Sequence, residues 1–236
     1  MAQYKNLFFD LDNTLWDFTA NAYEALKQTF MELEIMPQIG NFDEYYEVYT
    51  RINNSYWEQY RRNEIKKEFL STRRFEDSFK EYGVQIPVTG QQTHDRFMQI
   101  MPSKNKLTEG TIETLDKLFP KHRMFIITNG FKEVQYNKLK TAGLSQYFKR
   151  IFTSEEIKVP KPSKEIFDYA VKSVNARKRE SLMIGDSWEV DILGAMNAGI
   201  DQVYYCPSGI HSNKFESTGK ARTYIIQYIP ELLNYI

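Results

Sequence analysis

Short apolar segments alternate with helix-like segments from Lys106 onward, and this alternation limits the possible folds more than any other feature. The expected strands lie near residues 124–127, 151–152, 182–184, 203–205 and 221–226. The expected helices lie near residues 109–119, 132–142, 163–174 and 190–198, with a short helix near Pro230. Strands that alternate with helices build a parallel sheet covered on both faces. We therefore expect an α/β fold with a doubly wound parallel sheet.

A further buried strand is expected at residues 7–9, because Leu-Phe-Phe is continuously apolar. Asp10 and Asp12 follow it directly. Open parallel sheets bind ligands at the carboxyl ends of their strands, so both acids can reach one small volume above the sheet edge. One carboxylate could attack phosphorus while the other moves protons to the leaving group and from water. A simple turn capped by Asp12 is the structural alternative.

Residues 16–103 have helical periodicity and contain no strand-like run. Breaks that contain proline or glycine divide this region into about four helices. An all-helical block between a first strand and an alternating α/β pattern indicates an inserted domain. We expect an α/β core domain formed by residues 1–15 and 104–236, and a helical domain formed by residues 16–103.

The composition is that of an ordinary soluble protein, with 42% hydrophobic and 26% charged residues. Basic and acidic residues number 31 each, so no global field favours a nucleic-acid polymer. The single Cys206 excludes an intramolecular disulfide, and the three scattered histidines do not form a zinc-ligand cluster. Oxygen ligands, and therefore Mg²⁺, are expected if a metal binds. Without a signal peptide or a long apolar run, we expect a cytoplasmic protein with no membrane contact.

Polar residues also follow the strand expected near residue 127. A threonine hydroxyl and backbone N–H groups at a helix start bind phosphate well, which favours Thr128 and Asn129, although helix capping is the alternative. Lys161 lies between two prolines before a helix, and Pro162 restricts it to an extended conformation. Its ammonium could keep a nucleophilic carboxylate ionised and stabilise a phosphoryl group. Lys158 is the weaker candidate for this role.

A second acidic pair follows the strand expected at residues 182–184. Asp186 stands at the strand end, and we expect it to be a metal ligand. Asp191 falls in the first turn of the next helix, where an acid also complements the helix dipole. We expect Asp191 to support the metal ligands without binding the ion itself. Glu189 is an alternative for either position.

Taken in chain order, these residues resemble the motifs of the haloacid dehalogenase superfamily. The matching residues are Asp10, Asp12 and Thr14, then Thr128, then Lys161, then Asp186 and Asp191. The resemblance implies a Mg²⁺-dependent phosphatase that forms an aspartyl-phosphate, and it implies that the helical insertion is a cap over the substrate. Since the haloacid dehalogenases themselves lack the second aspartate, Asp12 favours phosphatase chemistry.

The resemblance also implies a role for each residue. Asp10 is the expected nucleophile, Asp12 the acid and base, and Lys161 the stabilising cation. The implied phosphate-binding residues are Leu11, Asp12, Thr128, Asn129 and Lys161. The implied Mg²⁺ ligands are the Asp10 carboxylate, the Asp12 backbone carbonyl and the Asp186 carboxylate, with Asp191 supporting them.

Within the superfamily, residues 128–139 and 185–194 look like the pyrimidine 5'-nucleotidase branch. A phosphatase or mutase acting on a sugar phosphate or phosphoglycolate is the alternative. From another class, the alternative is a non-catalytic phosphate-binding or interaction module, and the intact acids argue against it. The expected partner is a small phosphomonoester, and the chain is expected to be a monomer or a weak homodimer.

The expected cap is rich in aromatic and basic residues. The aromatic ones are Tyr45, Tyr46, Tyr49, Tyr56, Trp57 and Tyr60. Their helical spacing predicts that most of them pack inside the cap, while some could stack on a base. The basic ones are Arg61, Arg62, Lys66, Lys67, Arg73 and Arg74. We interpret the basic stretch as a solvated helix face.

Overall fold

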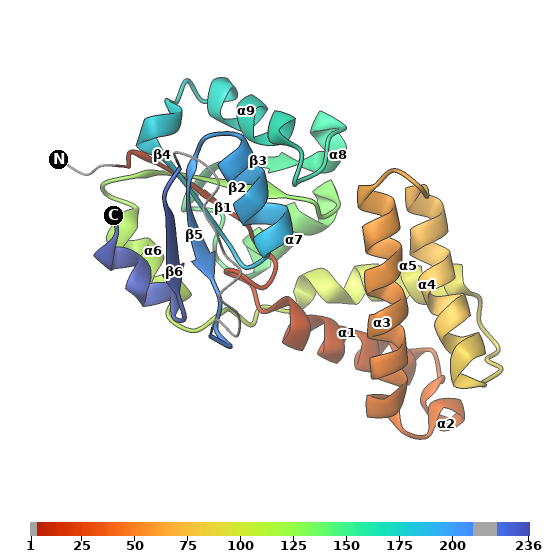
Figure 1. Ribbon diagram of the computed structural model, residues 1–236. Coiled ribbons are helices and arrows are strands. Elements are labelled where there is room, and N and C mark those ends of the chain that lie inside the picture. The colour runs from red at the N-terminus through yellow and green to blue at the C-terminus, as the bar shows by residue number, and fades with distance from the viewer. Residues whose placement is uncertain (1–3, 210–220) are drawn as a thin grey trace. The chain divides into compact units, whose positions relative to one another are not determined.

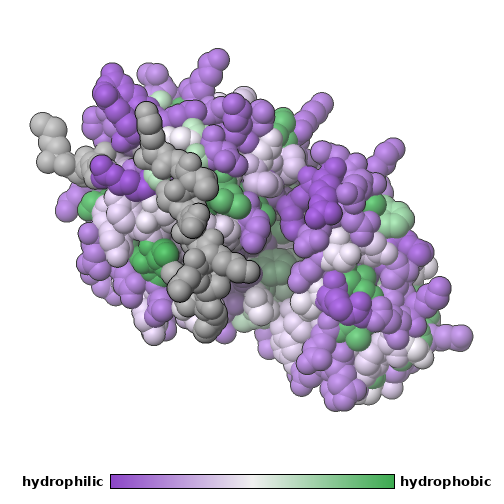
Figure 2. Space-filling view, in the orientation of Figure 1, coloured by the Kyte–Doolittle hydropathy of each residue, from purple (hydrophilic) through white to green (hydrophobic). Residues whose placement is uncertain are grey.

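The computed structural model describes residues 4–209 and 221–236 of the 236-residue chain. It divides into two compact units. Residues 1–18 and 105–236 form the first, called here the α/β unit, and residues 19–104 form the second, called the helical unit. The face in view in Figure 2 is mostly hydrophilic, with small separate hydrophobic patches. In the described ranges, no helix combines the length and the apolar character needed to span a membrane.

The α/β unit is built on a six-stranded sheet in the order β3-β2-β1-β4-β5-β6, with every neighbouring pair parallel (Figure 1). The strands are β1 (Asn6–Phe9), β2 (Arg123–Thr128), β3 (Phe148–Thr153), β4 (Ser181–Gly185), β5 (Asp201–Tyr205) and β6 (Thr223–Ile226). The predicted parallel α/β fold is confirmed. Phe9, the last residue of β1, pairs with Ile126 of β2 and Ile184 of β4. The residue after Phe9 therefore leaves the sheet between two neighbouring strand ends.

Helices cover both faces of this sheet. They are α6 (Thr111–Leu118), α7 (Lys132–Thr141), α8 (Ser154–Ile157), α9 (Lys164–Ser173) and α10 (Leu193–Asn197). On one face, Phe8 of β1 belongs to the same buried cluster as Ile166 and Phe167 of α9. Its neighbours Leu7 and Phe9 are also fully buried. Because adjacent residues of a strand point to opposite faces, the burial of all three shows that neither face of β1 meets solvent.

Two helices in the C-terminal half of the α/β unit have a geometry that the sequence did not indicate. The helix expected at 190–198 begins earlier, as a wide π-helical turn at Trp188–Ile192, and continues as α10. The short helix expected near Pro230 is a 3₁₀ helix, Ile229–Asn234. The wide turn matters for the site, because it sets the direction of Asp191.

The helical unit contains the helices α1 (Phe18–Glu32), α2 (Met36–Ile39), α3 (Phe42–Arg61), α4 (Lys67–Tyr82) and α5 (Gly90–Ile100). The first residue of α1, Phe18, still belongs to the first segment of the α/β unit. The sequence indicated only a break at α2, where Pro37 stands in a single helical turn. Tyr45 and Tyr49 of α3 are buried, and their rings contact Phe79 and Phe75 of α4. These two tyrosines therefore form part of the unit's own core, as their spacing predicted.

Arg74 corrects our interpretation of the basic stretch as a solvated face. Its residue surface is only 4% exposed. Its guanidinium donates to Asn53 Oδ1 at 3.1 Å and lies 3.1 Å from His94 Nδ1. It also lies over the rings of Phe75 and Phe97, with centroid distances of 4.8 and 5.5 Å. Residue type alone did not show that aromatic rings and neutral hydrogen-bond partners surround this position on α4.

Candidate active site

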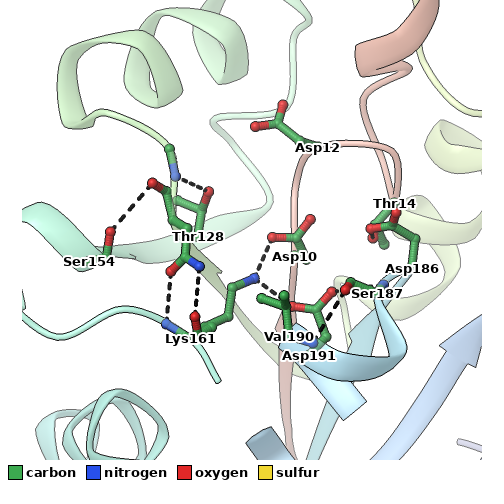
Figure 3. A network of polar contacts seen from close by, with 12 residues as sticks. Asp10, Asp12, Thr14, Thr128, Ser154, Lys161, Asp186, Ser187, Val190 and Asp191 are labelled. Atoms are coloured by element: carbon green, nitrogen blue, oxygen red, sulfur yellow. Dashed lines mark hydrogen bonds and ion pairs between the residues drawn. The ribbon is translucent and has the colours of Figure 1, made fainter. Parts of the chain in front are cut away.

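The carboxyl end of β1 supplies the first acid of the site. The Asp10 N–H donates to the Ile184 carbonyl at 2.8 Å, so β4 still holds the Asp10 backbone. The carboxylate stands beside Lys161 above the sheet edge (Figure 3). Asp10, Asp186 and Asp191 each offer one oxygen, and these oxygens all lie within 4.8 Å of one another. Two strand ends and the turn after β4 thus bring three predicted site residues together.

Lys161 joins two of these acids. Its Nζ donates to Asp10 Oδ1 at 2.5 Å and to Asp191 Oδ1 at 2.6 Å, and the residue is 2% exposed. The Asn129 side chain fixes the Lys161 backbone, since it accepts from the Lys161 N–H at 2.8 Å and donates to the Lys161 carbonyl at 2.9 Å. Lys158, the weaker sequence candidate, is exposed. The sequence did not reveal that Asn129 positions Lys161 through its side chain.

The pKa values in this cluster follow from burial and mutual repulsion. Burial raises the pKa of Asp10 well above its usual range, and Lys161 opposes that rise. Burial and the nearby Asp191 raise the pKa of Asp186 to about 7, against the hydrogen bond that Thr14 Oγ1 donates at 3.1 Å. Burial alone would lower the Lys161 pKa, but Asp10 and Asp191 raise it above its ordinary value. The ammonium is therefore a stable partner for these carboxylates.

Asp191 reaches the cluster because of the wide turn that precedes α10. Within this turn, the N–H groups of Asp191 and Ile192 both point at the Ser187 carbonyl, at 2.9 and 3.2 Å. Asp191 Oδ2 accepts from the Ser187 N–H at 3.1 Å. A Cβ on Gly185 would lie 2.4 Å from Asp191 Oδ2, so only glycine leaves room for this carboxylate. Glu189, the alternative to Asp186 or Asp191, is exposed.

The residues present fit a Mg²⁺ ion. The group Asp10, Asp186 and Asp191 offers only carboxylate oxygens, which are the ligands that Mg²⁺ prefers. With Asp12, four carboxylates face two buried ammonium groups, those of Lys138 and Lys161. When all six are ionised, two negative charges remain, which one divalent cation balances. Asp191 lies as close as the two acids expected near the metal, so a direct ligand role is open to it as well as the supporting one.

Thr128 lies at the carboxyl end of β2, where its hydroxyl can still donate one hydrogen bond. Its Oγ1 accepts from the Gly130 N–H at 3.0 Å and from Gln135 Nε2 at 2.8 Å. A hydroxyl has two acceptor positions and one donor, so the remaining capacity of Thr128 is to donate its proton. A phosphate oxygen can only accept from it. Its expected role in phosphate binding is compatible with this arrangement.

Asp12 lies beyond the end of β1, and its carboxylate points away from Asp186 (Figure 3). Two residues of α7 hold it. Gln135 Nε2 donates to Asp12 Oδ2 at 2.8 Å, and Lys138 Nζ donates to Asp12 Oδ1 at 2.6 Å. Sequence reasoning missed Lys138 as a site residue, because a lysine on a helix is solvated by default. The available signal was the spacing of Gln135 and Lys138, which places both on one helix face.

Known proteins are similar to this chain over nearly its whole length. The family model described as haloacid dehalogenase-like hydrolase matches residues 7–205. The chain is 30% identical to pyrimidine 5'-nucleotidase PynA of Streptococcus pneumoniae, covering 98% of this chain and 94% of that protein. It is 31% identical to pyrimidine 5'-nucleotidase YjjG of Escherichia coli, covering 96% and 95%.

A solved structure is similar over nearly the whole length. The crystal structure of the HAD-hydrolase YfnB of Bacillus subtilis, bound to magnesium, has a TM-score of 0.85, 27% sequence identity and 98% coverage of both chains. Sequence comparison with YfnB gives 30% identity, covering 88% of this chain and 86% of that protein. The range that the family model matches, residues 7–205, includes Asp10, Asp12, Asp186 and Asp191. The chain belongs to the haloacid dehalogenase-like hydrolase family.

Proposed function

We propose that the chain is a Mg²⁺-dependent phosphomonoester hydrolase that works through an aspartyl-phosphate on Asp10. One observation carries this proposal. The Asp10 carboxylate stands at the end of β1, fixed by Lys161 at 2.5 Å, with a second carboxylate, Asp12, two residues away on its own hydrogen-bond partners. A held nucleophile with a separate proton carrier suits two-step phosphoryl transfer.

In the first step, an Asp10 oxygen attacks phosphorus, and the bond from phosphorus to the leaving oxygen breaks. Asp12 gives that oxygen its proton. In the second step, Asp12 takes a proton from water, whose oxygen attacks phosphorus and releases inorganic phosphate and free Asp10. Lys161 balances the charge on the phosphoryl oxygens, which also accept from the Thr128 hydroxyl and the backbone N–H groups of Leu11, Asp12 and Asn129.

Mg²⁺ would be held by Asp10, Asp186 and the Asp12 backbone carbonyl, supported by Asp191. When bound, it supplies positive charge that offsets repulsion between the nucleophile and the incoming phosphate. The closeness of the Asp10, Asp186 and Asp191 oxygens supports this assignment. So does the similar YfnB structure, which is described as bound to magnesium.

We propose pyrimidine nucleoside 5'-monophosphates as the substrate class, and the helical unit as the cap that selects them. The two pyrimidine 5'-nucleotidases at 30% and 31% identity support this choice over nearly the full chain. A three-carbon sugar phosphate is the second candidate. It is favoured by the 30% identity to glyceraldehyde 3-phosphate phosphatase of Methanothermobacter thermautotrophicus, over 84% of both chains.

Phosphate release from a substrate panel tests both levels of the proposal. The panel contains pyrimidine and purine 5'-monophosphates, glyceraldehyde 3-phosphate, glucose 6-phosphate and phosphoglycolate, each with and without Mg²⁺. We expect the pyrimidine nucleotides to have the highest kcat/KM. We expect Asp10→Asn to lower kcat by a factor on the order of 10³ or more, since the nucleophile is lost.

Asp168→Asn is the matched control, because Asp168 lies on α9 and pairs with Lys178 outside the site. This variant is expected to keep wild-type turnover. A preference for a sugar phosphate would reject the nucleotidase assignment and leave the hydrolase assignment standing. Equal turnover by wild type and Asp10→Asn would reject the mechanism itself.

A further inference from the structure

Lys138 is a buried cation in the middle of α7. Its residue surface is 2% exposed, whereas Lys140, two positions further on, is exposed. Burying an ammonium costs several kcal/mol unless a counter-charge and polar contacts compensate. Lys138 has such a partner, because its Nζ donates to Asp12 Oδ1 at 2.6 Å. The buried position therefore has a specific electrostatic reason.

Aromatic rings complete the surroundings of the Lys138 ammonium. Its Nζ lies 4.2 Å from the ring centroid of Trp16 and 5.2 Å from that of Phe18. Trp16 is fully buried, so the packing around it holds its ring in place. Cation–π attraction at a desolvated site adds to the ion pair. The rings and the helix together restrict where Nζ can lie, and hence where the Asp12 oxygen that it holds can lie.

Gln135 holds the other Asp12 oxygen. The residue is 0% exposed, and its Nε2 donates to Asp12 Oδ2 and to Thr128 Oγ1, both at 2.8 Å. An amide nitrogen has two N–H groups, so both are in use. A Cβ on Gly130 would lie 1.8 Å from Gln135 Nε2, which shows how closely this amide crosses the loop after β2. One side chain thus joins the proposed proton carrier to the proposed phosphate-binding hydroxyl.

We propose that Lys138 and Gln135 are positioning residues that fix the Asp12 carboxylate for proton transfer to the leaving oxygen. This inference rests on the proposed hydrolase function. Asp12 follows the end of a strand and its side chain is 25% exposed, so without these contacts its side chain could adopt several rotamers. Each carboxylate oxygen has two lone pairs, so an oxygen held by Lys138 or Gln135 still has one for the transferred proton. Holding a reacting group in one geometry removes an entropic part of the barrier.

The test compares two leaving groups that need the proton to different extents. 4-Nitrophenolate leaves without protonation, whereas the alkoxide of an alkyl phosphomonoester, such as a nucleoside 5'-monophosphate, requires a proton. For Lys138→Met, we expect kcat/KM on the alkyl ester to fall by about 100-fold, the lower end of what acid catalysis contributes. We expect a loss of less than about 5-fold on 4-nitrophenyl phosphate, because its leaving group needs no proton. The two esters are compared by kcat/KM, since this ratio reports on the step in which the leaving group departs.

Gln135→Met is a second variant, close in size, that removes both amide donors. We expect the same selective loss, at about 10-fold, since one of the two contacts remains. Lys140→Met is the matched control on the same helix and should leave kcat/KM on both esters unchanged. Equal losses on both substrates in Lys138→Met and Gln135→Met would show a merely structural role and overturn the inference. If wild type hydrolysed neither ester, the proposed function would fail and the inference with it.

Discussion

Replacing Lys161 by methionine removes the ammonium that lies between Asp10 and Asp191. In the structure Nζ is 2.5 Å from Asp10 Oδ1 and 2.6 Å from Asp191 Oδ1, and Lys161 and Asp191 are almost fully buried. Methionine fills a similar volume but brings no charge and no donor. The variant therefore leaves two neighbouring carboxylates buried without their shared cation.

The expected cost follows from removing one partner of a buried ion pair, which destabilises proteins by about 3–5 kcal/mol. That cost applies when both carboxylates are ionised. Burial already raises the Asp10 pKa, and Lys161 is the main influence that lowers it, so the variant raises this pKa further. Protonation of Asp10 then removes one of the two charges. At pH 5 the loss of stability should be under about 2 kcal/mol, against about 3 kcal/mol or more at pH 8.

Urea unfolding without metal measures this difference at pH 8 and pH 5. Trp57→Phe in every protein removes the tryptophan of the helical unit, so that Trp16 and Trp188 report on the α/β unit alone. Lys164→Met is the control, because Lys164 is exposed three residues further on. It should change the free energy of unfolding by less than about 0.5 kcal/mol.

Two results would refute the electrostatic reasoning for Lys161. The first is a loss of less than about 1 kcal/mol at pH 8, which would mean that the carboxylates are solvated or already protonated with Lys161 in place. The second is an equal loss at pH 5 and pH 8. A pH-independent loss would assign the cost to packing, since only the charges change over this range.

Three further predictions concern other parts of the chain. Gly185→Ala should displace Asp191, because the new Cβ would lie 2.4 Å from Asp191 Oδ2, and should lower Mg²⁺-dependent phosphate release by about 10-fold or more. Mg²⁺ should raise the melting temperature of the α/β unit more at pH 8 than at pH 5, because protons compete for Asp186, whose pKa is about 7; an equal rise at both pH values would contradict this. Burial and Arg74 lower the pKa of His94 to about 4 from its ordinary 6.5. The contribution of neutral His94 to the free energy of unfolding is therefore complete above pH 6.5 and is lost as the pH falls toward 4. The free energy of unfolding of the helical unit, measured in urea, should therefore fall by about 1–2 kcal/mol between pH 7 and pH 5 after allowance for solvent screening. It should fall by less in His94→Gln.

The strand-end acids were predictable from the sequence because their signal is local. An apolar run followed at once by Asp10, and another followed by Asp186, place both carboxylates at one sheet edge in any parallel arrangement of those strands. The neighbouring position of β1 and β4 was the part that only the structure supplied. Once that pairing is known, the closeness of the two acids follows.

The partners of these acids were harder to predict, because their signal is not local. Lys138 looks like any helical lysine until Trp16, Phe18 and Asp12 surround it. Arg74 was misread for the same reason, since its aromatic neighbours come from two different helices. The direction of the Asp191 side chain depends on a wide turn, and no residue type in that segment indicates a π-helical geometry.

The two buried lysines divide the carboxylates by task. Lys161 binds Asp10 and Asp191, and Lys138 binds Asp12, so the proposed nucleophile and the proposed proton carrier do not share a cation. A single shared lysine would couple the two acids, because a change of charge on one would shift the cation that holds the other. With separate cations, the charge that changes when Asp10 is phosphorylated lies beside Lys161, and we expect the contacts of Asp12 with α7 to remain. Asp12 can then act in the second step from the same position as in the first, which a two-step reaction on one site requires.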